Sequence, residues 1–374
     1  MISLLHTADW QIGRIFSQFE PDDGAALFEA RFKVVERLAA VACERGVDAV
    51  LVAGDVFDAQ TIADKTIRRL FNAMQGFAGT WLLMPGNHDA ALSESIWSRA
   101  HRLGATPSNV TFCLEPKPYT MAGKFTLLPA PLTQRHTYGD LTEWFAAAPS
   151  GDGLARVGLA HGCVQGVLPA DIDSSNPIAE SRAQDAGLDY LALGDWHGTK
   201  RINDKTWYAG TPETDRFKAN DSGQALVVSI AGVGAVPRVE TIRTGQFIWQ
   251  QLESRLAVAS DIDELVAKLN SVGGGDVLEL STLGTCDLGG HRKLSAALDA
   301  ARARTRALVW NGEALHLEPT EEDIQALHAD GFVGEALQEL RSQQSASDAG
   351  LARDALLALA RILDAQGARA GAGA

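Results

Sequence analysis

The sequence is poor in cysteine and lacks long apolar runs. Its four cysteines, Cys43, Cys113, Cys163 and Cys286, are scattered over 374 residues without a CxxC spacing. This scatter argues against a zinc ribbon and against a disulfide framework, and it fits a reducing compartment such as the cytoplasm. No stretch approaches the roughly 18 apolar residues of a membrane span, and the first residues form no basic leader. We therefore expect a soluble cytoplasmic protein with no membrane partner.

Positive charge is also scarce. The sequence has 33 Lys and Arg against 47 Asp and Glu, a formal net charge of −14. Because non-specific affinity for nucleic acids comes largely from Lys and Arg, this balance is a caution against such a partner without excluding one. Basic residues still gather at Lys200/Arg201/Lys205 and at Arg216/Lys218, among other places. Solvated loops and helix faces are the simpler interpretation of each group.

Short apolar runs alternate with helical patterns over the first 200 residues. Runs that end at polar or glycine residues predict buried strands at 2–8, 49–53, 80–84, 156–160 and 190–193. Apolar residues at three- and four-residue steps predict helices over 28–42 and 62–74. This alternation indicates an α/β sheet covered by helices. The β-rich segments 206–208, 225–230 and 236–242 predict a second sheet, and so a sandwich.

The chain is too long for one core, since single cores stop growing near roughly 250 to 300 residues. A boundary near Thr244-Gly245 predicts a domain over residues 1–245, an α+β module over 246–318 and a helical region over 319–374. The last region is expected to contain helical, acidic sequence from Thr320, a flexible linker over 342–347 and an amphipathic helix over 351–363. That helix could dock on a partner or pack on the chain's own module, and both alternatives stay open.

Polar side chains follow five predicted strands, where each strand ends. In open α/β sheets, ligands bind at the carboxyl ends of the strands, so we expect these side chains to share one site. They are Asp9, Gln11, Asp55, Asn87, His161, Asp195 and His197. A lone Asp at a strand end is more often a turn or N-cap residue, but five such ends in succession favour a metal site.

Seven oxygen and nitrogen donors exceed the four of a structural zinc site and suit two cations about 3.5 to 4 Å apart. Because thiolates are absent from the set and oxygen donors prevail, Mn²⁺ is favoured, with Mg²⁺ and Fe as alternatives.

These motifs resemble the calcineurin-like metallophosphoesterase family, and within it the SbcD-type DNA repair exonucleases. The resemblance covers residues 1 to about 245 and is carried by 5–13, 54–58, 85–89, 160–162, 193–197 and 208–213. It implies a four-layer αββα sandwich, a smaller α+β capping domain and C-terminal helices. It also implies DNA as the substrate and an SbcC-like coiled-coil ATPase as the partner of those helices, with a homodimer as a further alternative.

The resemblance also implies roles for single residues. One metal ion would be held by Asp9, Gln11, Asp55 and His197, and the other by the bridging Asp55 with Asn87, His161 and Asp195. His88 would stabilise charge on the phosphate or protonate the leaving oxygen, with Asp58 orienting it. His6, inside the first strand, is expected to orient its neighbours rather than to bind metal.

Two positions depart from the family pattern, which has His where this chain has Gln11 and Asp195. The neutral amide of Gln11 is a poorer ligand than imidazole, so the first ion is expected to bind weakly. Asp195 adds a third carboxylate, which favours Mn²⁺ or Mg²⁺ over softer ions.

Three functions are compatible with this sequence. The first is a metal-dependent DNA phosphodiesterase, a nuclease or exonuclease of DNA repair or DNA end processing. The second uses the same site on a small phosphodiester or a phosphoprotein, and the third is a non-catalytic subunit of an ATPase complex. The first is favoured because a minimal phosphatase does not need the module that follows Gly245.

Overall fold

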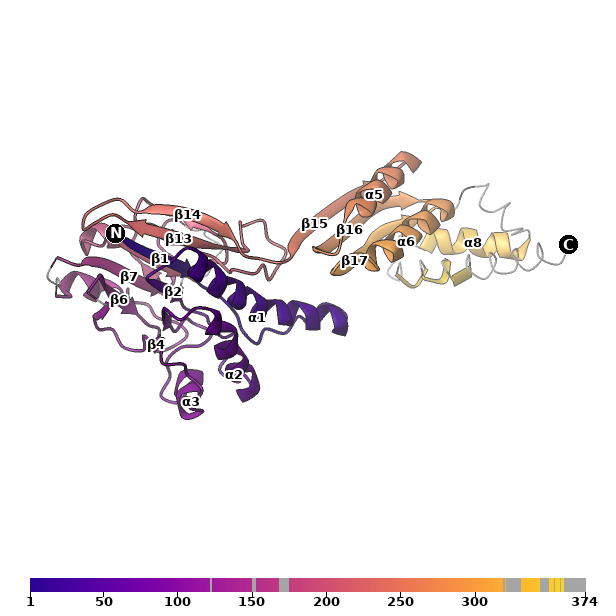
Figure 1. The fold of residues 1–374 in the computed structure, drawn as a ribbon. Coiled ribbons are helices and arrows are strands. Elements are labelled where there is room, and N and C mark those ends of the chain that lie inside the picture. The colour runs from indigo at the N-terminus through magenta and orange to yellow at the C-terminus, as the bar shows by residue number, and fades with distance from the viewer. Residues whose placement is uncertain are drawn as a thin grey trace. The chain divides into compact units, whose positions relative to one another are not determined.

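The computed structural model describes residues 1–121, 123–149, 153–167, 175–318, 320, 331–343, 350–352, 354–356 and 358–359. Within it the chain forms two compact units, Met1–Phe247 and Ile248–Ala374 (Figure 1). The expected division into three domains stays a prediction. Among the described residues, no helix is long and apolar enough to cross a membrane. All four cysteines are free thiols.

The first sheet of unit 1 is mostly parallel. Its strands run in the order β14, β13, β1, β2, β3, β4. They are β1 (Ile2–Thr7), β2 (Ala49–Ala53), β3 (Thr80–Met84), β4 (Val110–Phe112), β13 (Gln224–Ile230) and β14 (Arg238–Arg243). β1 to β4 are parallel neighbours, whereas β13 pairs antiparallel with β1 and β14 antiparallel with β13. The carboxyl ends of β1, β2 and β3 therefore meet at one edge of the sheet.

The second sheet has the order β11, β12, β10, β7, β6, β5. Its strands are β5 (Tyr119–Met121), β6 (Phe125–Ala130), β7 (Ala155–His161), β10 (Tyr190–Gly194), β11 (Lys200–Arg201) and β12 (Thr206–Tyr208). The central strands β6, β7, β10 and β12 are parallel, and β5 and β11 are antiparallel edges. Two further short strands, β8 (Cys163–Val164) and β9 (Pro177–Ile178), pair with each other.

Two pairs of strands lie in a different sheet from the one that the sequence predicted. β13 and β14 were expected in the second sheet, but they extend the first, because β13 pairs with β1 from Ile2↔Ile230 to His6↔Leu226. Conversely, β7 and β10 leave the first sheet and form the centre of the second. All of these strands are short buried runs, and such runs specify burial rather than a pairing partner.

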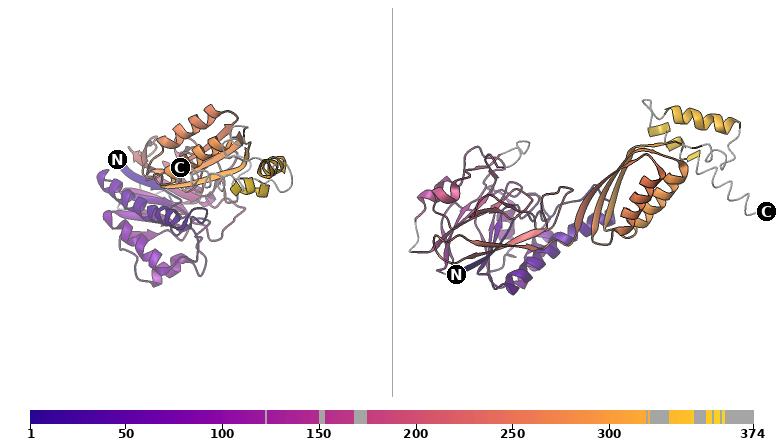
Figure 2. Two further views of the ribbon diagram at one scale, coloured as in Figure 1. Left: turned by 90° about the vertical axis from the view of Figure 1, so that its right-hand side faces the viewer. Right: turned by 90° about the horizontal axis from the view of Figure 1, so that it is seen from above.

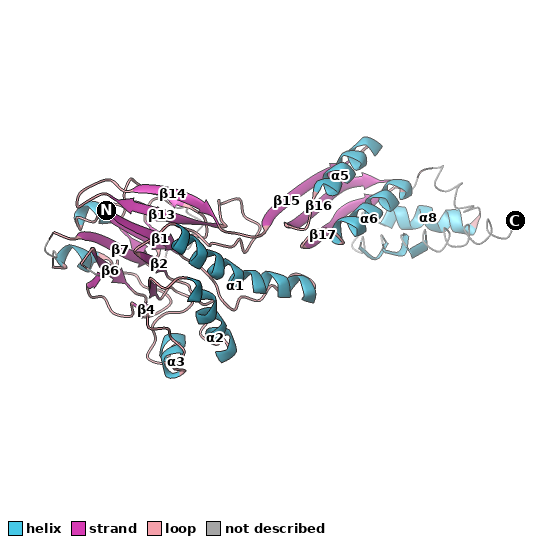
Figure 3. Ribbon diagram, in the orientation of Figure 1, coloured by secondary structure: helices cyan, strands magenta, loops and turns pink. Residues whose placement is uncertain are grey.

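Unit 1 has four layers (Figure 3). Helices α1 (Pro21–Glu44), α2 (Asp64–Ala73) and α3 (Ile96–Arg102) pack on the outer face of the first sheet, with the short helix η1 (Met74–Gly76). A second core fills the space between the two sheets and includes Leu51, Leu159 and Leu226. Helices η2 (Glu143–Ala147) and α4 (Arg182–Asp185) contribute Phe145 and Ala183 to a third core on the outer face of the second sheet. The expected αββα sandwich is confirmed.

Unit 2 is a small parallel α/β module. Strands β15 (Ile248–Leu256), β16 (Asp276–Cys286) and β17 (Ala307–Leu317) form one parallel sheet, connected by helices α5 (Ala259–Ser271) and α6 (Leu288–Arg302). Both helices lie on the same face of that sheet (Figure 2). Leucines of all three strands and both helices pack into a single core. The module was expected to be α+β, but its strands are all parallel and alternate with helices, so it is α/β. Its role as a cap stays a prediction.

The region after residue 318 is described only in part. Helix α8 (Phe332–Gln343) takes in the first two residues of the expected linker, and residues 344–347 lie outside the described residues, as do 321–330. Of the expected helix over 351–363, the described residues are helical, whereas 353, 357 and 360–363 lie outside them. Ala352 and Leu356 are buried, and Leu356 belongs to the core of unit 2. Of the two alternatives, the described part of this helix packs on its own module.

The core between the two sheets gives a direct test of the fold. Leu51 in β2 is fully buried there. Replacing it with alanine is expected to lower the free energy of unfolding by about 2–5 kcal/mol, because apolar contacts are lost and a cavity remains. Urea unfolding followed by circular dichroism measures the change. The control is Val233→Ala at a position that is 62% exposed, where a change within about 0.5 kcal/mol is expected. Equal effects of the two substitutions would contradict the two-sheet packing.

Candidate metal centre

The loops after β1 and β2 run side by side beyond the sheet. Asp9 N donates to Gly54 O at 3.1 Å, Gln11 N to Asp55 O at 3.0 Å and Ile12 N to Val56 O at 2.9 Å. These backbone hydrogen bonds continue the parallel pairing of the two strands past their ends. As a result, Asp9 and Asp55 are placed next to each other by the backbone itself.

Four of the expected ligands have a strained backbone. Asp9, Gln11 and Asp55 have φ near +51°, and Asp195 has φ of +99°. Among the described residues, only two other non-glycine residues have positive φ, Asn176 and Asp221. Such conformations cost of order 1–3 kcal/mol each and persist where surrounding structure enforces them, as at functional sites. The strain therefore marks the strand ends that the sequence had singled out.

Two glycines allow the loops to close on one another. A Cβ at Gly54 would lie 2.2 Å from His161 Nδ1, and a Cβ at Gly86 would lie 2.2 Å from Asp55 Oδ1. Gly54 also has φ of +91°. Only glycine allows this approach, so both residues are part of the cluster's geometry.

Asp9, Asp55 and His161 form a buried cluster. Each offers a ligand atom, and the three atoms lie within 4.8 Å of one another. His161 Nδ1 donates to Ala53 O at 2.8 Å, which leaves Nε2 toward Asp55 Oδ1 at 3.5 Å and Asp195 Oδ1 at 3.6 Å. A backbone carbonyl that fixes one ring nitrogen and presents the other is typical of metal-binding histidines.

The side chains of Asn87 and Gln11 contact this cluster. An amide terminal atom of Asn87 lies 3.0 Å from His161 Nε2 and 3.1 to 3.2 Å from the two Asp55 carboxylate oxygens. Gln11 Nε2 donates to Asp55 Oδ2 at 2.8 Å. Gln11 Oε1 is buried and has no hydrogen-bond partner among the described residues. A buried carbonyl oxygen without a partner costs about 1–3 kcal/mol, so a cation in contact with it would be stabilising.

The electrostatics of the cluster fit a divalent cation. Burial raises the pKa of Asp9 to about 6, with the neighbouring carboxylates adding to the rise and His197 and His161 opposing it. Burial likewise raises the pKa of Asp195. Burial alone would lower the pKa of His161, but Asp55, Asp9 and Asp195 together raise it to about 9. The carboxylates of Asp9, Asp55 and Asp195 thus lie close enough to act on one another and on His161.

His197 lies beside this cluster and outside its 4.8 Å limit. Its Nδ1 is 3.1 Å from Asp215 Oδ2, and Arg216 Nη2 is 2.9 Å from Nδ1 and 3.3 Å from Nε2. When Nδ1 donates its proton to Asp215, Nε2 is the ring nitrogen that can accept a metal ion. Asp215 therefore has the place of the carboxylate that orients a metal-binding histidine.

His88 and Asp58 differ in detail from what the sequence led us to expect. His88 Nδ1 contacts the backbone carbonyl oxygen of Asp58 at 2.9 Å, and the Asp58 carboxylate instead lies 3.8 Å from Arg14 Nη1. His88 N donates to Asp55 Oδ1 at 2.9 Å. The imidazole is half-buried, with 33% of the side chain exposed. It therefore borders the cluster and remains accessible to a substrate.

His6 joins the two sheets. Its Nδ1 is 2.9 Å from the Tyr190 hydroxyl and its Nε2 is 3.2 Å from Leu193 O. Burial lowers its pKa to about 3, with the contact to Leu193 opposing the shift. Both ring nitrogens are occupied, so His6 positions β1 against β10.

Sequence reasoning missed two buried carboxylates, Asp89 and Asp215. Asp89 accepts from Gly86 N at 2.7 Å and from Phe57 N at 3.0 Å, and so ties the loop after β3 to the loop after β2. Burial, reinforced by Asp55, raises its pKa to about 8. Asp89 was visible as the last residue of the Gly86–Asp89 motif, whereas Asp215 carried no signal beyond standing next to Arg216.

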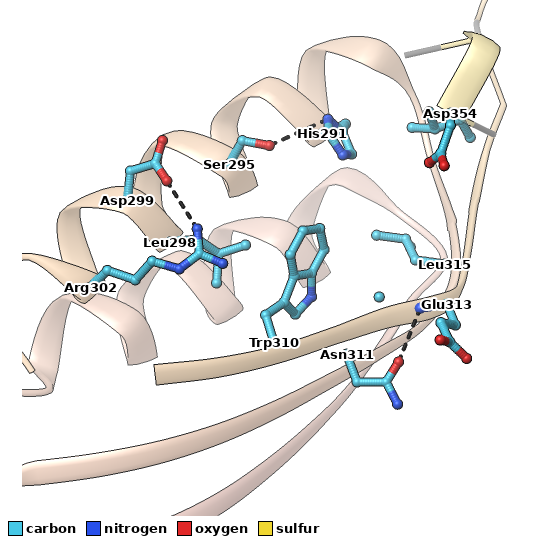
Figure 4. A pocket seen from close by; sticks show the side chains of 12 residues that line it. His291, Ser295, Leu298, Asp299, Arg302, Trp310, Asn311, Glu313, Leu315 and Asp354 are labelled. Carbon is cyan, nitrogen blue, oxygen red and sulfur yellow. Dashed lines mark hydrogen bonds and ion pairs between the residues drawn. The ribbon is translucent and has the colours of Figure 1, made fainter. Parts of the chain in front are cut away.

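A separate cavity of about 550 Å³ occurs in unit 2 (Figure 4). Residues of α6 and β17, including His291, Arg302 and Trp310, line it together with Asp354. Arg302 is paired with Asp299 at 3.1 Å, and Trp310 Nε1 donates to Thr282 Oγ1 at 3.0 Å. None of the expected site residues lines this cavity.

The fold and the cluster define a four-layer α/β protein with a candidate site for divalent metal. The chain belongs to the calcineurin-like phosphoesterase family, whose sequence profile matches residues 2–229. It is therefore a metallophosphoesterase, a hydrolase whose family binds divalent metal ions.

Two curated proteins are similar to this chain. It is 23% identical over 266 residues to the DNA double-strand break repair protein Mre11 of Methanosarcina acetivorans, covering 66% of this chain and 40% of that protein. It is 34% identical over 93 residues to the SbcD component of nuclease SbcCD of Rhodobacter capsulatus, covering 24% of this chain and 22% of that protein. The chain thus spans less than half the length of either relative.

A solved structure, that of TT1561 of Thermus thermophilus, covers 65% of this chain and 99% of its own, at 10% identity and a TM-score of 0.39. A likeness of this degree adds nothing to the family assignment.

The shifted pKa values predict how pH affects the cluster. The pKa of Asp9 is about 6 in the folded protein against an ordinary 3.8, and that of His161 is about 9 against 6.5. Without metal, the folded state therefore holds more protons than the unfolded state. The protons held by Asp9 and His161 stabilise the folded state fully at pH values below the ordinary pKa of each group. This stabilisation is lost as pH rises through about 6 for Asp9 and about 9 for His161. Thermal melting of metal-free protein across this range should show the decline.

A bound cation must displace these protons, so Mn²⁺ is expected to bind at least about tenfold more tightly at about pH 8 than at about pH 6. Titration calorimetry in two buffers of different ionisation enthalpy measures both the affinity and the protons released. Equal affinity at the two pH values, with no proton release, would contradict this description of the cluster.

Proposed function

We propose that this protein is a divalent-metal-dependent DNA phosphodiesterase, a nuclease that acts in DNA repair or DNA end processing. The observation that carries the proposal is the buried cluster of Asp9, Asp55 and His161 at the strand ends of a calcineurin-like phosphoesterase domain. The names of the two curated relatives, a DNA double-strand break repair protein and a component of a nuclease, support DNA as the substrate. Both alignments are partial, so the substrate is proposed at the level of its class.

The donors divide into two sets around Asp55. Asp9, Gln11, Asp55 and His197 would hold one ion, and Asp55, Asn87, His161 and Asp195 the other. Three carboxylates and two amides are hard oxygen donors, which favours Mn²⁺, with Mg²⁺ or Fe as alternatives. Bound ions would neutralise the phosphate oxygens and acidify the attacking water. The chain itself keeps these side chains aligned, through the strained strand ends and the paired loops.

His88 is proposed to act on the leaving oxygen. Its Nδ1 donates a hydrogen bond to the carbonyl oxygen of Asp58. Nε2 is therefore the nitrogen that can exchange a proton with the substrate. Its backbone N–H holds Asp55, which fixes the distance between His88 and the cluster. Asp58 thus acts through its backbone, and its carboxylate is left to pair with Arg14.

Two substitutions separate the proposed roles of Asp55 and His88. Asp55→Ala is expected to abolish cleavage of DNA in Mn²⁺, because both ions lose their shared carboxylate. His88→Ala is expected to retain metal but to lower kcat by about 10²- to 10⁴-fold, the usual contribution of a proton donor. Initial rates on a labelled duplex and a labelled single strand measure both effects.

The matched control for His88 is His101→Ala, which removes an exposed imidazole from α3. Its rate should equal that of the parent. Full cleavage by both Asp55→Ala and His88→Ala would sink the proposal. Turnover of a small phosphodiester with DNA untouched would favour a small-molecule or phosphoprotein substrate, and binding of no divalent ion at millimolar levels would favour a non-catalytic subunit.

Gln11 is expected to make the two ions bind with unequal affinity. Its neutral amide already donates to Asp55 Oδ2, so only its carbonyl oxygen is available to a cation. Mn²⁺ titration followed by electron paramagnetic resonance should resolve one tight and one weak ion. Gln11→His should strengthen the weak ion by about tenfold or more, since imidazole is the better ligand. Gln18→His, which adds an imidazole at an exposed position, should change neither ion. Two ions bound with equal affinity in the parent protein would contradict this role of Gln11.

A partner is proposed on similarity alone. The SbcD component of nuclease SbcCD is by its name one part of a complex. We extend to this chain an SbcC-like ATPase as the partner of the C-terminal helices. Within the described residues, Leu356 is buried in the core of unit 2, so an ATPase would have to use other residues of this region.

A further inference from the structure

Two of the basic groups in the sequence meet beside His197. Lys200 lies in the segment that follows β10, and Arg216 and Lys218 lie in the segment that follows β12. The two segments are joined by hydrogen bonds, from Thr199 N to Asp221 O at 3.2 Å and from Thr211 N to His197 O at 3.0 Å. Lys200, the first residue of β11, is therefore held on a segment connected to the one that carries Arg216 and Lys218.

Asp215 fixes Arg216 in this group. Its two carboxylate oxygens accept from Arg216 Nε and Nη2, both at 3.0 Å, and Oδ2 is also 3.1 Å from His197 Nδ1. Asp215 is 1% exposed, whereas 43% of the Arg216 side chain is exposed. The bidentate pair uses Nε and Nη2 of the guanidinium, and Nη2 also lies 2.9 Å from Nδ1 of His197, a proposed metal ligand.

Trp196 positions the two lysines. The Lys200 ammonium is 5.7 Å and the Lys218 ammonium 5.4 Å from the centre of the indole ring. Contacts of this kind are worth about 0.5–1 kcal/mol at exposed sites, enough to bias where a flexible side chain rests. Trp196 lies between Asp195 and His197 in the chain. Both ammonium groups therefore contact the side chain of a residue that directly adjoins two proposed ligands.

Neither lysine is paired in the way that several other cations of unit 1 are. Many exposed Lys and Arg side chains there lie within 3.2 Å of a carboxylate, as do Arg37, Arg45, Arg69, Lys117 and Lys124. Within the described ranges, neither Lys200 nor Lys218 has a carboxylate partner within 4 Å, and Lys200 donates only to Val167 O at 3.4 Å. On a chain of net charge −14, unpaired positive charge beside the proposed site is available to an anion.

We propose that Arg216, Lys218 and Lys200 bind the phosphates that flank the scissile bond, and so make this enzyme selective for a polynucleotide over a short phosphodiester. The inference rests on the proposed function and specifies which residues recognise the substrate. A short diester brings a single phosphate, which the bound metal ions would take. Cations placed outside those ligands can contribute only when the substrate carries further phosphates along the chain. Asp215 and Trp196 act through these cations as positioning residues.

The test compares two substrates with one double variant. Lys200→Ala/Lys218→Ala is assayed in Mn²⁺ on a labelled oligodeoxynucleotide and on bis(p-nitrophenyl) phosphate, which has one phosphate. The loss of kcat/KM is expected to be at least about ten times larger on the oligonucleotide, and to arise mainly from KM. The dependence of log kcat/KM on log salt concentration should flatten by about 1.4 for a single strand, since two phosphate contacts are lost.

The control is Lys117→Ala. Lys117 is also a lysine over an aromatic ring, 5.6 Å from that of Tyr119, but β5 is at the opposite edge of the second sheet from β11. It should change neither rate nor salt dependence. Equal losses on both substrates, or no loss on the oligonucleotide, would overturn the inference while the nuclease function stood. A parent protein that hydrolyses only the small diester would instead overturn the proposed function.

Trp196 provides a second, independent readout. Trp196→Leu should raise KM on the oligonucleotide by removing the ring, and Trp196→Phe should restore part of that loss, because phenyl retains some attraction for cations. Thermal melting of both variants shows whether they fold. If the two variants bind the oligonucleotide equally well, the positioning role of Trp196 is wrong.

Discussion

The structure of the site depends on one buried carboxylate, that of Asp55. It stands at the end of β2 with φ of +51° and is 2% exposed. Its oxygens accept from His88 N at 2.9 Å and from Gln11 Nε2 at 2.8 Å, and so join the loops after β1 and β3 to its own. His161, at the end of β7, brings the second sheet to the same point, with its Nε2 3.5 Å from Asp55 Oδ1. Three loops of the first sheet and the end of β7 in the second are thus fixed around one negative charge.

That arrangement places like charges together in a buried space. Burial raises the pKa of Asp9 and of Asp195, and the surrounding carboxylates add to both shifts. The chain offsets the charge only in part, through His161 and the amides of Gln11 and Asn87. A divalent cation is the natural counter-charge, which ties the stability of the folded state to the chemistry that the family performs. Outside the cluster the charge is positive instead, since Arg216, Lys218 and Lys200 lie on the neighbouring segments after β10 and β12.

The sequence predicted the strands that present the ligands better than it predicted how they pair. β2 and β3 have the expected bounds, because both are five-residue apolar runs that end at Gly54 or precede Gly86. β6 was missed because Pro129 breaks its apolar pattern, although it is a central strand of the second sheet. β13 was assigned to the wrong sheet because its antiparallel pairing with β1 joins segments more than 200 residues apart. No local pattern contains such a pairing.

The site residues show the same contrast between what local sequence predicts and what depends on contacts between distant segments. Seven donors were predicted from strand ends, since parallel strands present their ends to a common edge, and the structure brings the ligand atoms of Asp9, Asp55 and His161 within 4.8 Å of one another. Asp215 was missed because its role comes from contacts with Arg14, Arg216 and His197, which only the folded chain brings together. His88 was expected to be oriented by Asp58, and the group of Asp58 that contacts it is the backbone carbonyl, which no residue identity encodes.

The central claim is that Asp55 is shared by two metal ions at the joined ends of the two sheets. An anomalous difference map of crystals soaked in Mn²⁺, recorded at the manganese edge, tests it most directly. Two peaks about 3.5 to 4 Å apart, both within coordination distance of Asp55, are predicted, the stronger beside His161 and Asp195 and the weaker beside Gln11. A single peak that Asp55 does not contact, or no peak at the strand ends, would contradict the account.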